Sequence, residues 1–175
     1  FTTGTSDSIS SELQTGPLGS DLSQPLTIFN ISLITNPLPS GNVTGRFIYD
    51  GRVVGKRAAF YDAASNTTNL FAGTASPGAT GALLSTYQSW ASVFNGGSSQ
   101  INLNGGGFAS NIDPGAHVID GLTIGSRFTD TGPNSMNGDI AEIAVFNRLL
   151  NAAEFKIMSN FYSAKYQLPV ATNLY

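Results

Sequence analysis

The apolar residues of this chain fall in short runs, and nearly every run is bounded by a cluster of glycine, proline, asparagine or serine. The clearest run is LTIFNISLIT (26–35), which is rich in β-branched and aromatic residues and ends at Asn36-Pro37. Such runs are typical of β-strands, because turn residues interrupt the chain before a helix could form. We therefore expect a fold built from many short strands.

Similar runs continue along the chain. We expect strands at residues 46–50, 57–62, 69–73, 120–128 and 138–148, and a loop at TASPGATG (74–81). The clearest hairpin joins 89–95 to 100–104 through a Gly-Gly-Ser-Ser turn. Its second arm, QINLN, alternates polar and apolar residues, which predicts one packed face and one solvent-exposed face.

A single segment has helical spacing. Asn151 is a suitable N-cap and Glu154 lies three residues later, which is the arrangement of a capping box. Apolar residues then recur at helical intervals up to a proline; they are Phe155, Met158, Phe161, Tyr162 and Tyr166. We expect a helix over 151–166 whose aromatic side chains pack onto a sheet.

Many short strands and one terminal helix favour an all-β fold, a two-sheet antiparallel β-sandwich. A chain of 175 residues accommodates one domain with a proper core. Residues 1–24 are polar with turn signals and are predicted to form an irregular N-terminal arm. The domain itself is expected to span 25–175.

Three stretches also resemble a known family. They are SWASVFNGGSSQINLNGGGFAS, DGLTIGSRF and NGDIAEIAVFNRLLNAAEFKIMSNFYSAKYQL. Their order resembles the concanavalin A-like, laminin-G-type jelly-roll domains over roughly residues 26–168. The resemblance implies a jelly roll of two antiparallel sheets. It also implies roles in glycan binding, adhesion, accessory modules of secreted enzymes, or decoration of viral and cell-surface assemblies, and fold alone does not choose among these.

Composition narrows the choice of function. Only 11% of residues are charged, and the net charge is −3 with eight lysines and arginines, which argues against nucleic-acid binding. No apolar run approaches the roughly 20 residues of a membrane span. A surface of hydroxyls, amides and glycine suits an extracellular, virion-surface or cell-surface protein. Because the chain begins at Phe1, we expect a processed product or a piece of something longer.

Asp139 and Glu142 raise the question of catalysis, because related glucanases carry carboxylates on one strand. A retaining pair must share a face at about 5–5.5 Å. Residues three apart point to opposite faces of a regular strand, unless a bulge intervenes. The chain has neither glucanase pattern, Glu-x-Asp-x-Glu or Glu-x-Asp-x-x-Glu. His117, the only histidine, lies in a predicted loop without a nucleophile motif. We expect no enzyme.

Ligand contacts are predicted at three residues. Tyr87 precedes a strand and offers an aromatic face for a sugar, whereas Trp90 is mid-strand and expected to be buried. Arg52 and Arg57 belong, with Arg46 and Lys56, to a basic cluster that could hold an acidic glycan or a partner protein, although solvated strand ends are the favoured explanation of the cluster.

The family resemblance implies calcium as the cofactor to consider. Asp113, Asp120 and Asp130 lie in or beside predicted loops, and carboxylate oxygens suit this cation. Their spacing matches no EF-hand, and loop aspartates commonly cap turns, so turn capping is the favoured interpretation and no cofactor is predicted.

The leading hypothesis is a non-catalytic, surface-exposed binding or decoration module that recognises carbohydrate through rim loops. The alternative is a structural decoration protein that stabilises a capsid, tail or filament, with the arm 1–24 as a strap. A homo-oligomer within such an assembly is compatible with either. A glycoside hydrolase is the least favoured. A lectin is expected to leave a polar pocket with an aromatic floor.

Overall fold

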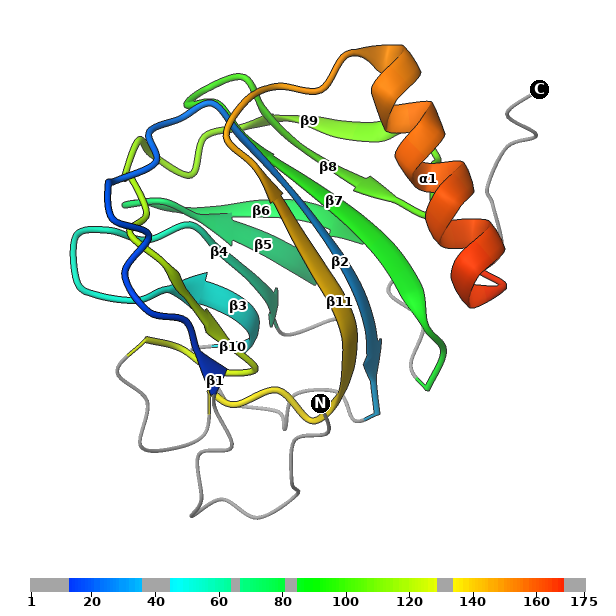
Figure 1. Cartoon of the computed structure of the whole chain (residues 1–175), viewed down its shortest axis with the longest axis horizontal. Coiled ribbons are helices and arrows are strands. Elements are labelled where there is room, and N and C mark those ends of the chain that lie inside the picture. The colour runs from blue at the N-terminus through cyan, green and yellow to red at the C-terminus, as the bar shows by residue number, and fades with distance from the viewer. Residues whose placement is uncertain (1–12, 36–44, 64–66, 81–84, 129–133, 169–175) are drawn as a thin grey trace.

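A computed structural model describes residues 13–35, 45–63, 67–80, 85–128 and 134–168 (Figure 1). Within these residues the chain forms two antiparallel sheets and one helix. The six-stranded sheet has the order β1-β10-β3-β4-β5-β6, formed by Leu13–Gln14, Leu122–Ile124, Arg46–Gly51, Ala59–Ala63, Thr67–Phe71 and Ala75–Thr80. The five-stranded sheet has the order β11-β2-β7-β8-β9, formed by Gly138–Phe146, Leu26–Ile34, Gln88–Phe94, Ser99–Leu103 and Phe108–Ile112. The predicted antiparallel β-sandwich is confirmed.

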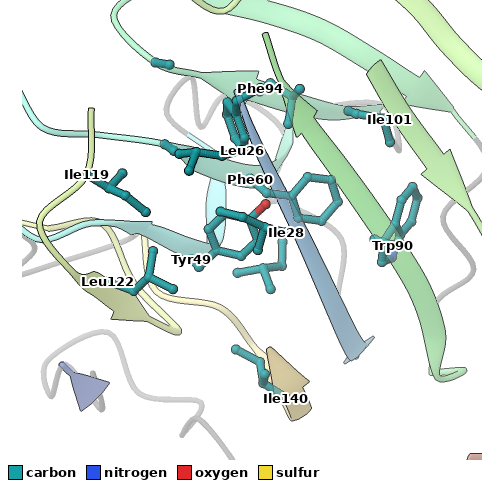
Figure 2. Close-up of a cluster of buried hydrophobic side chains, with 14 of the residues drawn as sticks. Leu26, Ile28, Tyr49, Phe60, Trp90, Phe94, Ile101, Ile119, Leu122 and Ile140 are labelled. Carbon is teal, nitrogen blue, oxygen red and sulfur yellow. The ribbon is translucent and has the colours of Figure 1, made fainter. Parts of the chain in front are cut away.

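Alternating side chains of the two sheets meet in one large apolar core. Figure 2 shows Ile28, Tyr49, Phe60 and Trp90 directed into the space between the sheets. Trp90 is fully buried, as its position in mid-strand predicts, and its ring lies 5.3 Å from that of Phe60. This packing fixes the two sheets face to face.

The predicted loop at 74–81 is wrong over most of its length. Residues Ala75–Thr80 form β6, which pairs with β5 at the edge of the six-stranded sheet. Proline is tolerated there because an edge strand can spare the missing N–H on its outer side. β9, which follows the Gly105–Gly107 run, was not expected either.

The helix α1 (Ala152–Tyr166) begins as predicted. The Asn151 side chain accepts a hydrogen bond from the Glu154 amide, and the Glu154 carboxylate accepts one from the Asn151 amide. α1 covers the outer face of the five-stranded sheet, where Tyr162 is buried against Phe29. Phe161, expected in the packed stripe, instead points outward and is 49% exposed. Among the described residues, no helix has the length and apolar character that crossing a membrane requires.

Residues 13–24 pack along the edge of the six-stranded sheet. β1 pairs with β10, and Leu22 forms two backbone hydrogen bonds with Ile119. The described part of the predicted arm is therefore part of the sandwich; residues 1–12 lie outside the described ranges. We call residues 15–22, which run from β1 across the end of β10, the flap.

Candidate functional site

β11 contains a β-bulge that changes the relation between its two carboxylates. Asp139 lies opposite Leu33 on β2, and Glu142 lies opposite Ile31, because the register shifts by one residue at Ala141. Leu33 and Ile31 are two residues apart and share a face, so their partners also share it. The expectation that Asp139 and Glu142 point to opposite faces is wrong.

Glu142 is held by side chains from the end of α1. Lys165 Nζ donates to Glu142 Oε2 at 2.6 Å, and the Tyr166 hydroxyl donates to the same oxygen at 2.7 Å. Partial burial acts to raise the pKa of Glu142, but these hydrogen bonds outweigh it and the pKa is lowered. A carboxyl with a lowered pKa is ionised at neutral pH and lacks the proton that a general acid must donate.

Tyr87 lies close to Asp139 and to Tyr166 of α1. Its side chain is half-buried, and its ring packs against the apolar cluster beneath α1. Burial, followed by the neighbouring Asp139 carboxylate, raises the pKa of Tyr87. The predicted sugar platform therefore lies beside a carboxylate near the C-terminal end of α1.

Two members of the basic cluster, Arg52 and Lys56, are paired with acidic side chains. Arg52 Nη2 lies 3.2 Å from Asp120 Oδ2, and Lys56 Nζ lies 2.7 Å from Asp21 Oδ1. Lys56 is also 4.0 Å from Asp120. Arg52 and Lys56 thus join the turn after β3 to the flap and to the start of β10, which assigns them a fastening role.

Arg57, which the sequence suggested as a ligand contact, is buried and is not available to a ligand at the surface. Its Nη2 lies 2.6 Å from Oδ2 of the fully buried Asp50. Its guanidinium also lies over the rings of Phe71 and Phe128, at 4.2 and 4.6 Å. His117 packs edge-on against Phe71 and is half-buried. Arg57 is an internal support of the six-stranded sheet.

The aspartates considered as calcium ligands do not form a common site in the described residues. Asp113 accepts a hydrogen bond from the Gly115 amide, which is turn capping, and Asp120 is paired with Arg52. Asp130 lies outside the described residues. In the described part of the chain, no three acidic or histidine side chains are grouped so that they could hold a metal ion.

An open hollow of about 270 Å³ lies between α1 and the turn that joins β8 to β9. The turn side is formed by Asn102, Gly105, Gly106 and Phe108. Asn104 and Gly105 both have positive φ, 49° and 69°, and are the central residues of a β-turn in which the Gly106 amide donates to the Leu103 carbonyl. The turn therefore presents backbone and one aromatic ring, and Phe108 is 39% exposed.

The helix side of the hollow supplies Phe155, Lys156 and Ser159. The rings of Phe108 and Phe155 meet edge to face at 5.0 Å, which fixes the orientation of the exposed ring. The polar side chains of the lining are Asn102, Lys156 and Ser159, and the lining is otherwise mostly apolar.

Phe108 was not among the ligand-binding residues predicted from the sequence. The sequence around Phe108 gave little indication of a ligand site, because a phenylalanine that follows three glycines shows no strand pattern. The hairpin turn before it and the apolar positions of α1 were both visible, but their proximity depends on the helix crossing back over β8.

No protein-family profile matches the chain, and no curated protein matches it in sequence. Solved structures do resemble it. A heptameric SAP-like pentraxin from Limulus polyphemus superposes with a TM-score of 0.56 at 14% identity, over 85% of this chain and 76% of that one. A putative carbohydrate binding protein from Bacteroides ovatus has a TM-score of 0.62 at 15% identity, over 85% of this chain and 44% of its own.

Trypanosoma rangeli sialidase in complex with sialic acid matches at a TM-score of 0.54 and 16% identity. The match covers 90% of this chain but only 28% of the sialidase chain. At such identities the likeness shows the fold. The chain shares the β-sandwich fold of these proteins, and it spans less than half the length of the last two.

Proposed function

We propose that the chain is a non-catalytic carbohydrate-binding module and that the hollow beside Phe108 is its sugar site. The observation that carries this proposal is an exposed aromatic ring that is fixed by Phe155 and shares its hollow with polar side chains from β8 and α1. Binding sites of this kind combine apolar surface with a few placed polar groups. The likeness in fold to a putative carbohydrate binding protein supports the same class of ligand.

Each residue has a defined part in this proposal. The face of the Phe108 ring is electron-rich and complements the C–H groups on one face of a pyranose. Lys156 and Ser159 provide donors for ring hydroxyls from the helix side. The Asn102 amide donates to the Gly106 carbonyl and so holds the turn in shape.

The proposed setting follows from the surface chemistry. Only 11% of residues are charged, and we assign the module to an extracellular, virion or cell surface as part of a larger assembly. A purely structural decoration protein is the competing role, and it needs no sugar.

Calorimetric titration of the full chain with a panel of neutral and acidic disaccharides tests the proposal. Phe108→Ala is expected to weaken binding by about tenfold or more, because it removes the aromatic face on which the sugar is proposed to stack. Phe161→Ala is the matched control, since Phe161 is an exposed phenylalanine of α1 outside the hollow. Phe161→Ala is expected to bind as the parent does.

Tyr87→Ala separates the two candidate platforms. α1 rises about 1.5 Å per residue, so the group around Tyr166 lies about 15 Å along the helix from Lys156. If Tyr87→Ala abolishes binding and Phe108→Ala does not, the sugar site is the Tyr87 group. Absence of binding to the whole panel supports the structural role instead.

A further inference from the structure

A second cavity, on the opposite side of the sandwich from β9, lies between the edges of the two sheets. Its volume is about 370 Å³, and it opens between β10 and the edge strand β11 beneath the flap. The lining is aliphatic and comprises Leu18, Leu22, Ile119, Leu122, Ile143 and Val145, among others. This volume falls within the roughly 300–1,000 Å³ typical of small-molecule sites.

The residues that line the cavity are buried at its floor and exposed to solvent at its mouth. Ile119 and Leu122 are buried and belong to the main core, whereas Leu18 and Val145 are 47% and 38% exposed. Thr15 and Asn147 are the polar side chains of the lining. No charged side chain lines the cavity.

The flap is fastened so that it stands over the cavity. Its backbone is hydrogen-bonded to β10 and the preceding loop, through Thr15 to Leu122 and Leu18 to Asp120. Gly121 permits this close approach, since a Cβ there would lie 2.8 Å from Thr15 Oγ1. The Lys56–Asp21 ion pair holds the flap from its outer side. The cavity is therefore preformed.

We propose that this cavity binds the alkyl chain of an uncharged amphiphile. An aliphatic wall without charge favours a hydrocarbon and disfavours an ionic group, because a buried charge without a partner is costly. Apolar surface in a preformed pocket favours an apolar ligand group, because burying it removes that surface from water. The polar head of the ligand lies at the mouth, beside Thr15 and Asn147, and the cations near the flap are already paired with Asp21 and Asp120.

The ligand class separates this site from the hollow beside Phe108. The two cavities share no lining residue and lie against different edges of the five-stranded sheet. Alkyl-chain binding at this cavity and sugar binding at the hollow can therefore be tested independently.

Titration of the full chain with 1-octanol, followed by two-dimensional amide NMR, tests the proposal. Saturable shifts are expected at Leu22, Leu122 and Ile143, with 1,8-octanediol binding more weakly because its second hydroxyl would enter the apolar floor. Shifts scattered over exposed apolar residues, or no shifts at the lining, would overturn it.

Variants at the mouth exclude a nonspecific solvent effect. Val145→Trp and Leu18→Trp place a large ring at the opening from exposed positions, so they fill the cavity without cutting into the core. Each is expected to weaken octanol binding by about tenfold or more. Val54→Trp, at a residue that is 79% exposed and outside the lining, is the matched control and keeps parental affinity. Unchanged octanol binding in both mouth variants contradicts the proposal.

Discussion

Arg57 and Asp50 form a buried ion pair in which Arg57 Nη2 lies 2.6 Å from Asp50 Oδ2. Asp50 also accepts hydrogen bonds from the Gly51 and Phe128 amides, so its carboxylate joins β3 to the segment after β10. Burial raises the pKa of Asp50, and the Arg57 guanidinium acts against that shift. The pair therefore holds β3, Arg57 and the segment after β10 together.

Removing only the cation is therefore expected to be costly. Arg57→Met leaves a buried carboxylate without its counter-charge, and the free energy of unfolding should fall by about 3–5 kcal/mol. Urea denaturation measures the change. The double variant Asp50→Asn/Arg57→Met carries no buried charge and should recover much of the loss. A single variant as stable as the parent would show that the pair is not a structural support.

Asp62 predicts a specific pH dependence of stability. Burial raises its pKa to about 6, and Arg46 opposes the shift only in part. The unfolded carboxyl has a pKa of about 3.9, so the folded state binds the proton more tightly. The stabilisation is present below about pH 4 and is lost as the pH rises through about 6.

Asp62→Asn removes this titration while it keeps a neutral side chain. Between pH 4 and pH 7, the parent should lose about 2 kcal/mol of stability relative to Asp62→Asn. Parallel denaturation curves at several pH values give the difference directly. A difference that is constant over this range would mean that Asp62 titrates near its ordinary value.

Gly138, the first residue of β11, allows the chain to approach β2 closely. Its φ is +150°, and a Cβ at this position would overlap the carbonyl oxygen of Leu33. Gly138→Ala is expected to cost more than about 3 kcal/mol, because two backbones would have to separate. Thermal unfolding of this variant beside Gly107→Ala is a matched comparison, since nothing lies within 4 Å of a Cβ at Gly107.

Local sequence patterns were sufficient for much of the fold. β2, the β7–β8 hairpin and the capped helix follow from side-chain alternation, turn residues and the Asn151–Glu154 box. β6 was missed because strand patterns cannot reveal that a Pro-Gly segment lies at a tolerant sheet edge. The bulge at Ala141 was missed because it depends on how β2 pairs with β11.

The sites were harder to predict, because they depend on contacts between distant segments. Arg57 and Arg52 were both visible as cations, but their partners Asp50 and Asp120 are chosen by the fold. Arg57 is buried in its ion pair with Asp50, whereas Arg52 binds Asp120 just before β10. Phe108 gained its significance only from Phe155, which α1 brings back across the sheet.

The location of bound sugar is the most direct test of the central claim. Two-dimensional amide NMR of the full chain, titrated with the tightest-binding disaccharide of the panel, should show saturable shifts at residues 102–108 and 152–159. In Phe108→Ala these shifts should need about ten times more sugar, or more, to saturate, whereas Phe161→Ala should titrate as the parent does. Shifts centred instead on Tyr87, Asp139 and Tyr166, or no saturable shift with any sugar, would contradict the account.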